Sequence, residues 1–162
     1  MQDDFETTRN RDQIARTEDH QFGMYYALEL GWSTPALGAD RNAALLHAQA
    51  SRGWRLGSEA SLFADGALTS RVENRSATDS LLSAGVRYYR PTGSSGLFFA
   101  GVSAAAGHEL DADHELTLGG DTGLRGYPLR FQNGSGTALL TIEERYYTKH
   151  SPWKIADVGA AV

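Results

Sequence analysis

The residues that could carry chemistry in this chain are its histidines and an acidic stretch at residues 108–115. The five histidines are dispersed, and only His108 and His114 lie close together in the sequence. Two histidines at i and i+2 on one strand face would favour zinc, and the sequence lacks that spacing. The acidic stretch also lacks the glycine and the ligand spacing of a calcium loop. We therefore expect neither a metal site nor a cofactor.

Nucleophilic chemistry finds equally little support. No serine stands in a Gly-x-Ser-x-Gly pattern, and the similar run at 133–136 is not placed between a strand and a helix. His47 and Ser51 are the one pair whose spacing could serve a small barrel enzyme with catalytic residues on its outer wall. Both fit an inner wall better, so we expect a protein that is not an enzyme.

Composition narrows the class of protein further. In 162 residues, 15 Lys and Arg stand against 20 Asp and Glu, which gives a formal net charge of −5. The basic residues form no patch, so we expect no nucleic-acid partner. Cysteine is absent, which excludes disulfides and thiol chemistry. The sequence contains no run of about 18 apolar residues, so no transmembrane helix is predicted. Membrane-spanning strands would not be visible in the mean hydropathy of −0.40, because their apolar and polar residues alternate.

Alternation with a period of two residues marks the strands that must position any site. It is strongest at Phe22–Trp32, where even positions are large and apolar and odd positions are mostly small or polar. Leu82–Tyr89 and Phe98–Ala106 repeat the pattern. Weaker candidate strands are Phe5–Ile14, Ala43–Gly53, Glu59–Arg71, Thr137–Thr148 and a last one that begins near Trp153. Roughly eight strands, with no helix of similar quality, predict an all-β antiparallel fold.

The turns and strand lengths favour a membrane barrel. Pro, Gly, Asn and Ser gather at 34–40, 90–96 and 132–136, and each segment predicts a hairpin connection. Strands of about 10 to 14 residues exceed the usual length in soluble sheets and match a tilted strand that crosses a membrane. Aromatic residues near the strand ends fit a membrane interface. A soluble sandwich or lipocalin-like barrel shows the same alternation, so the pattern alone leaves both classes open.

The least strand-like segment is Leu118–Phe131, with the sequence LGGDTGLRGYPLRF. Its glycines allow tight turns, and Leu124, Tyr127 and Phe131 can anchor a loop. A loop that folds back into a barrel needs this combination with Arg125, because inner-wall carboxylates would satisfy the guanidinium through bidentate hydrogen bonds. We therefore expect a lumen-directed loop at about 111–136.

This segment resembles the loop signature of the bacterial surface antigen superfamily, which includes barrel-assembly insertases, two-partner secretion transporters and chloroplast import channels. The residues that match this lumen loop motif are Gly119, Gly120, Leu124, Arg125, Gly126 and Tyr127. The resemblance implies a sixteen-stranded barrel whose long loop tucks into the lumen, where its arginine meets acidic residues. Glu143 and Arg145 follow the loop with the parity of inner-wall residues, so we expect them to face the lumen as its partners.

Weaker similarities at 16–23, 51–54 and 110–113 extend the resemblance over most of the chain. Glu144 departs from it, since it falls where the family has an apolar lipid-facing residue; we expect it near an interface or in a pair. The chain also stops after Val158–Val162, before an aromatic-aspartate-glycine motif that helps hold the loop arginine in the family. We therefore expect residues 1–162 to form one partial barrel domain, with the remainder of the barrel missing from this chain.

The resemblance implies a place in the bacterial outer membrane, with outer-membrane lipids and polypeptide substrates as partners. The expected function is the insertion of outer-membrane proteins or the translocation of polypeptides. A soluble antiparallel β-sandwich or barrel that binds a ligand or partner is the alternative.

Overall fold

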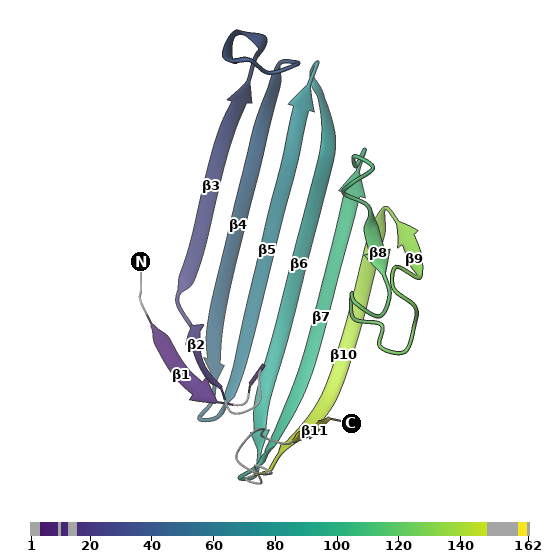
Figure 1. The fold of residues 1–162 in the computed structure, drawn as a ribbon. Helices are drawn as coiled ribbons and strands as arrows, with labels where there is room; N and C mark the ends of the chain where they lie inside the picture. The colour runs from purple at the N-terminus through teal and green to yellow at the C-terminus, as the bar shows by residue number, and fades with distance from the viewer. Residues whose placement is uncertain (1–3, 10, 13–15, 149–158, 162) are drawn as a thin grey trace.

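The computed structural model describes residues 4–9, 11–12, 16–148 and 159–161. The described residues form an all-β fold, with a single short 3-10 helix, η1 (Pro35–Leu37) (Figure 1). The strands are β1 Phe5–Arg9, β2 Thr17–Gln21, β3 Met24–Ser33, β4 Ala43–Leu56, β5 Ala60–Glu73, β6 Ser76–Thr92, β7 Gly96–His108, β8 Leu116–Leu118, β9 Gln132–Gly134, β10 Gly136–Tyr147 and β11 Gly159–Ala161. Within these residues, no helix is both long enough and apolar enough to cross a membrane.

One antiparallel sheet dominates the molecule, with the strand order β11-β10-β7-β6-β5-β4-β3. Strands β3 to β7 pair with their sequence neighbours, and β10 returns to pair with β7 after a long connection. β1–β2 and β8–β9 form two separate hairpins. The structure thus confirms an all-β antiparallel fold built on a seven-stranded sheet. The sheet is open, and β3 and β11 are its edges.

Several predicted elements differ from the observed ones. Phe5–Ile14 is not one strand, because the chain leaves β1 after Arg9 and a second strand, β2, pairs back onto it. The alternating segment at Leu82–Tyr89 lies within a longer strand that starts at Ser76, beyond an irregularity. The segment 132–136 does not join neighbouring sheet strands: β9 pairs with β8. The predicted start of the last strand near Trp153 lies outside the described residues.

Alternation gives the sheet two faces of different character. Cross-strand partners share parity, as in Tyr26↔Ala50 and Val86↔Val102, so even-numbered residues of the long strands, from Leu82 onwards in β6, lie on one face. We call this the apolar face. The odd-numbered residues form the polar face, which carries side chains such as Glu29 and Asp65.

The buried core lies on the polar face, at the end where short turns join β4 to β5 and β6 to β7. Its members are Phe22, Phe63, Tyr89, Leu97 and Phe99. The Phe63 ring lies 5.0 Å from that of Phe22 and 5.9 Å from that of Tyr89, centroid to centroid. Because Phe22 follows β2, this cluster holds the N-terminal hairpin against the sheet.

Candidate functional site on the polar face

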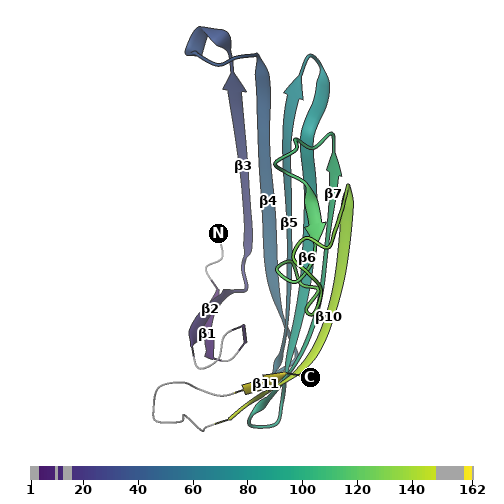
Figure 2. The ribbon, with the colours of Figure 1, turned by 45° about the vertical axis from the view of Figure 1, so that its right-hand side comes forward.

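The long connection between β7 and β10, residues 109–135, is the segment that carries the predicted motif; we call it the long loop. Figure 2 shows that it lies on the same side of the sheet as the N-terminal hairpin. At its start, Asp79 donates its backbone N–H to the carbonyl of Glu109 at 2.7 Å. At its end, Gly107 donates to the carbonyl of Ser135 at 2.7 Å. The predicted loop at 111–136 thus corresponds to an ordered excursion over the polar face.

The glycine-rich part of the loop forms consecutive tight turns. Gly119 donates to Thr122 Oγ1 at 2.7 Å, and Leu124 donates to the Gly119 carbonyl at 3.0 Å. Gly119 is buried, and a side chain there would collide with the backbone of Pro128 and Arg130. Glycine is required at this close approach because any Cβ would force the turns apart.

The three apolar residues expected to anchor the loop differ in their burial. Leu124 is half-buried, but Tyr127 and Phe131 are 53% and 50% exposed, so the expectation that both anchor the loop is wrong. Their rings pack on each other, with 5.0 Å between the centroids. Gly126, with a φ of 89°, allows the turn in which Tyr127 donates its N–H to the Leu124 carbonyl at 3.2 Å.

Arg125, at the end of these turns, reaches one carboxylate of the polar face, that of Glu143. Its Nη2 lies 3.5 Å from Glu143 Oε1, while 81% of its side chain remains exposed. The predicted bidentate contact is not formed, because the other oxygen, Oε2, accepts a 2.7 Å bond from Arg145 Nε. Glu143 is 12% exposed, so two arginines share a mostly buried carboxylate.

Arg145 connects this carboxylate to the N-terminal segment. Its guanidinium donates to the carbonyl of Arg11 and lies 3.9 Å from Asp12 Oδ1. It also stacks over the Phe99 ring, 4.1 Å from the centroid. Arg145 of β10 therefore joins Glu143, the carboxylate that the long loop also contacts, to the core and to the N-terminal segment at Arg11 and Asp12.

Arg11 is a site residue that sequence reasoning missed. It is 8% exposed, and its guanidinium lies 5.8–5.9 Å from the rings of Phe22, Phe63 and Tyr89. Its Nη2 donates to Ser61 Oγ at 3.1 Å. Arginine suits this place because its flat cation can lie against aromatic faces while it bonds to an oxygen. A lone arginine in a polar segment gives no sequence signal of such burial.

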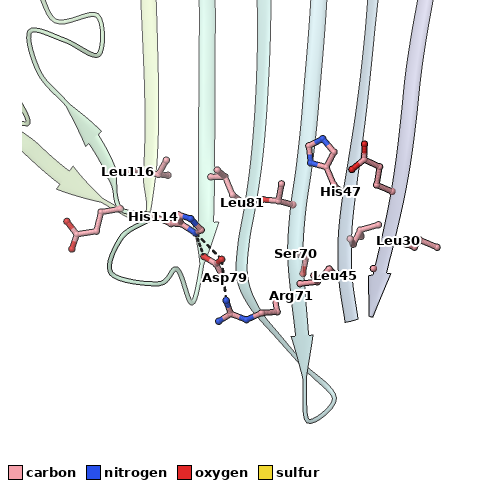
Figure 3. Close-up of a pocket in the computed structure, with 14 residues that line it drawn as sticks. Leu30, Leu45, His47, Ser70, Arg71, Asp79, Leu81, His114 and Leu116 are labelled. Atoms are coloured by element: carbon pink, nitrogen blue, oxygen red, sulfur yellow. Dashed lines mark hydrogen bonds and ion pairs between the residues drawn. The ribbon is translucent and has the colours of Figure 1, made fainter. Parts of the chain in front are cut away.

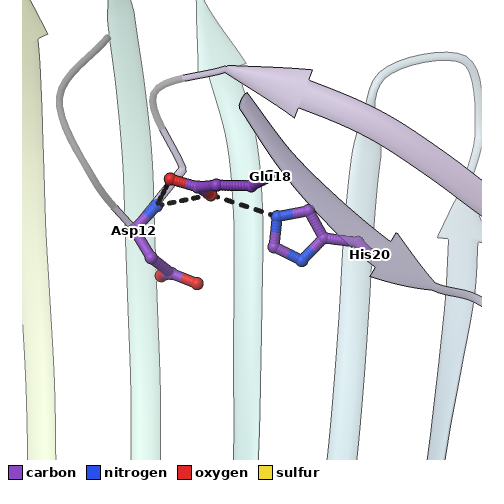
Figure 4. A group of neighbouring side chains, drawn as sticks. All are labelled: Asp12, Glu18 and His20. Carbon is purple, nitrogen blue, oxygen red and sulfur yellow. Dashed lines mark hydrogen bonds and ion pairs between the residues drawn. The ribbon is translucent and has the colours of Figure 1, made fainter. Parts of the chain in front are cut away.

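A carboxylate-histidine group, shown in Figure 4, has the residue types that can hold a metal ion. It consists of Asp12, Glu18 and His20, whose candidate ligand atoms lie within 4.8 Å of one another. Protein donors already bind the carboxylates: Glu18 accepts the Asp12 N–H at 3.0 Å, and Asp12 accepts the Tyr89 hydroxyl at 2.7 Å. With Arg145 nearby as well, this geometry serves hydrogen bonding better than metal binding.

A groove of about 730 Å³ lies between the sheet and the long loop (Figure 3). Leucines from β4, β6 and β8 line it together with charged residues from β3, β5 and the loop. His47 lies in this groove, four residues from Ser51 on the same strand face. Four residues along a strand span about 13 Å, too far for a nucleophile and its base to exchange a proton directly.

Comparison of the chain with protein-family models, with curated proteins and with solved structures gave no match in any of the three.

Proposed function

We propose that this chain contributes membrane-spanning strands to an outer-membrane β-barrel of the surface antigen superfamily. The observation that carries the proposal is the uncovered apolar face. Its exposed large side chains extend from β3 to β10: Met24, Tyr26, Leu28, Leu30, Trp32, Leu56, Val72, Leu82, Val86, Val102, Leu140, Ile142 and Tyr146. Water-soluble monomers rarely expose a contiguous apolar patch above a few hundred Å². Lipid is the environment in which such a face is stable.

Strand dimensions agree with this environment. The long strands of the sheet run from 10 residues in β3 to 17 in β6. A tilted strand needs about 9–11 residues to cross the hydrocarbon core. Trp54, Tyr88 and Phe98 lie near the core end of the apolar face, where aromatic rings would meet the headgroups.

Two charged residues of the apolar face, Arg52 and Glu144, have contacts that are compatible with lipid. Arg52 stacks on Trp54 with its guanidinium 5.2 Å from the ring, which can carry the charge toward the interface. Glu144, the departure from the family pattern, is partnered with Phe98 in register and accepts the hydroxyl of Thr92. The sequence predicts that Glu144 lies near an interface or in a pair; its partner is the neutral hydroxyl of Thr92, near the end of the strand.

The open edges indicate that the sheet needs further strands. Backbone groups along β3 face outward without a described strand beside them, and in a bilayer each such group would cost several kcal/mol. Closure into a barrel removes that cost. We infer that the long loop then lies in the lumen, and that the barrel handles polypeptides rather than catalysing a reaction, as the motif resemblance implies.

Refolding tests the membrane part of this proposal. The chain is diluted from denaturant into buffer, detergent micelles or phospholipid vesicles, and far-UV circular dichroism, sedimentation and flotation are measured. We expect strand signal only with micelles or vesicles, and flotation with vesicles. A cooperative monomer in buffer would show that a protein layer or water covers the apolar face, and would overturn the proposal in favour of a soluble sheet.

A second assay tests the polypeptide part. The folding rate of a small reporter barrel is compared in empty vesicles and in vesicles that hold the chain. We expect faster folding with the chain, and a smaller gain for Arg125→Ala than for the control Arg130→Ala in the same loop. Correct insertion of the chain without any acceleration would leave the membrane sheet in place and exclude an insertase role.

A further inference from the structure

The root of the long loop is held by a cluster of charges at the far end of the sheet from the core. Asp111 accepts two bonds from Arg71 of β5, at 2.7 and 3.0 Å. His114 places Nδ1 at 2.8 and 2.9 Å from the two oxygens of Asp79 in β6. Asp79 also accepts the backbone N–H of Asp111 at 3.2 Å. Figure 3 shows the contacts of Asp79 with His114 and Arg71.

A distortion of β6 aims Asp79 at the loop. The pairing of β5 with β6 shifts register between Thr69 and Arg71, and Asp79 has a positive φ of 43°. Such bulges insert one extra residue and redirect a side chain, and positive φ is costly for a residue with a Cβ. The carboxylate of Asp79 is only 12% exposed, whereas the His114 ring is 56% exposed. A mostly buried acid therefore meets an accessible imidazole.

We propose that Asp79 and His114 form a pH-dependent latch that holds the root of the long loop more tightly when His114 is protonated and loosens it when His114 is neutral. The latch closes one wall of the groove described above, since Asp79, His114 and Leu116 all line it. These contacts between the loop and the sheet are independent of what covers the apolar face, so the latch goes beyond the proposed membrane function.

The surrounding charges favour the protonated ring. Acidic groups act on it from two elements: Asp79 from β6, and Asp111 and Asp113 from the loop. The hydrogen bond to Asp79 is the main cause that raises the pKa of His114 above its ordinary value of 6.5, and charges on Asp79 and Asp113 add to it.

Positive charges oppose this effect in part. Arg71 lies 3.6 Å from Asp79, although it also pairs with Asp111 and Glu73. Arg41, from the turn after η1, acts mainly toward Asp111 and Glu73. Glu29, His47 and Glu115 line the same groove. Since carboxylates outnumber cations around the ring, the net electrostatic effect favours the imidazolium and raises the pKa of His114.

The sign of the pH effect follows from these shifts. Because the folded pKa of His114 is raised, the latch is fully present below about pH 6.5 and is lost as pH rises through the folded value. The hydrogen bonds from Arg71 lower the pKa of Asp111, so that contact persists through the pH range in which His114 titrates. A neutral imidazole can still donate one hydrogen bond, but it loses the charge assistance.

Two measurements on the full chain in detergent micelles test the latch. The His114 Cε1–H resonance is followed against pH, and we expect a midpoint above 6.5 that Asp79→Asn lowers. Amide exchange at residues 109–118 is followed between about pH 5 and 8, corrected for intrinsic rates. Protection should fall as pH rises, by about tenfold for each unit by which pairing raises the pKa.

Matched variants separate the latch from general pH effects. His114→Gln should abolish the pH dependence, and because the ring is exposed this change does not threaten the fold. His108→Gln, at the end of β7, should keep it. A midpoint at or below 6.5, or a pH dependence that persists in His114→Gln, would overturn the proposal.

Discussion

At the scale of single residues, the two arginines that share Glu143 differ in what they stabilise. Arg125 is exposed and lies 3.5 Å from the carboxylate, a geometry in which an ion pair contributes about 0–1 kcal/mol. Arg145 is 17% exposed, and it also contacts Phe99 and the N-terminal segment. Its removal would leave Glu143 mostly buried with a single distant partner. The motif arginine therefore contributes less to stability than the arginine on the strand.

This contrast yields a prediction for the free energy of unfolding, measured by urea titration in detergent micelles. Arg145→Leu should lower it by about 2–4 kcal/mol, because removing one partner strands a buried charge. Arg125→Ala should lower it by less than about 1 kcal/mol. Adding Glu143→Gln to Arg145→Leu should recover part of the loss. Equal losses for both single variants would contradict this assignment.

Gly53 on β4 is a second residue whose role depends on a close approach. A Cβ there would lie 2.8 Å from the carbonyl oxygen of Gln21 and 2.9 Å from both Phe22 Cα and the Phe63 ring. Gly66 on β5 has its nearest neighbour at 3.5 Å, an ordinary contact. Only the first glycine is needed for the hairpin to pack on the sheet.

We therefore expect Gly53→Ala to destabilise the fold by about 1–3 kcal/mol through overpacking. Gly66→Ala should be neutral or stabilise by a few tenths, because alanine restricts the unfolded chain. The same urea titration measures both. Similar values for the two variants would show that the hairpin yields to the added methyl group.

At the scale of elements, the N-terminal hairpin is attached to the sheet mainly through Phe22 and Arg11. Phe22 is 5% exposed in the core, and Arg55 stacks over its ring at 4.1 Å. Asp4 pairs with Arg55 through two hydrogen bonds, which lower the pKa of Asp4. Phe5, in β1, is by contrast 56% exposed.

Phe22→Ala should release this hairpin before the rest of the sheet unfolds. The loss of a buried phenylalanine costs about 3–5 kcal/mol, and local opening would then expose residues 5–21 to protease. Limited proteolysis with mass spectrometry measures the cleavage rate in micelles. Phe5→Ala is the control, and protease should cleave it no faster than the wild type. Equal cleavage rates in all three proteins would mean that other contacts hold the hairpin.

The sequence predicted the strands correctly where the alternation is long and regular. It did not predict the side-chain contacts that depend on residues far apart in the chain. Glu143 and Arg145 share a face because parity along one strand is a local property. The contact of Arg71 with Asp111 joins residues 40 apart, and the bulge at Asp79 interrupts the pattern that would mark it. Arg11 is buried by rings from three other segments, so its role depends wholly on tertiary packing.

At the scale of the whole molecule, the two faces of one strand should respond differently to the same charge. Ala104 and Ser103 are adjacent and exposed in the middle of β7, on the apolar and polar faces respectively. Their cross-strand partners in β6, Ala84 and Gly85, are small; their partners in β10 are Ala138 and Leu139, and both positions are exposed. The two sites therefore differ mainly in what lies outside the sheet.

Arginine at each position tests what that environment is. In phospholipid vesicles, Ala104→Arg should cost about 2–4 kcal/mol, because lipid at mid-depth cannot solvate the charge, while Ser103→Arg should cost about 0–1 kcal/mol. Urea titration of the folded chain in vesicles measures both. Water on the apolar face would make the two costs equal, since a hydrated surface accepts arginine at either site. The difference between the two free energies is thus a direct measure of how far lipid covers this face of the sheet.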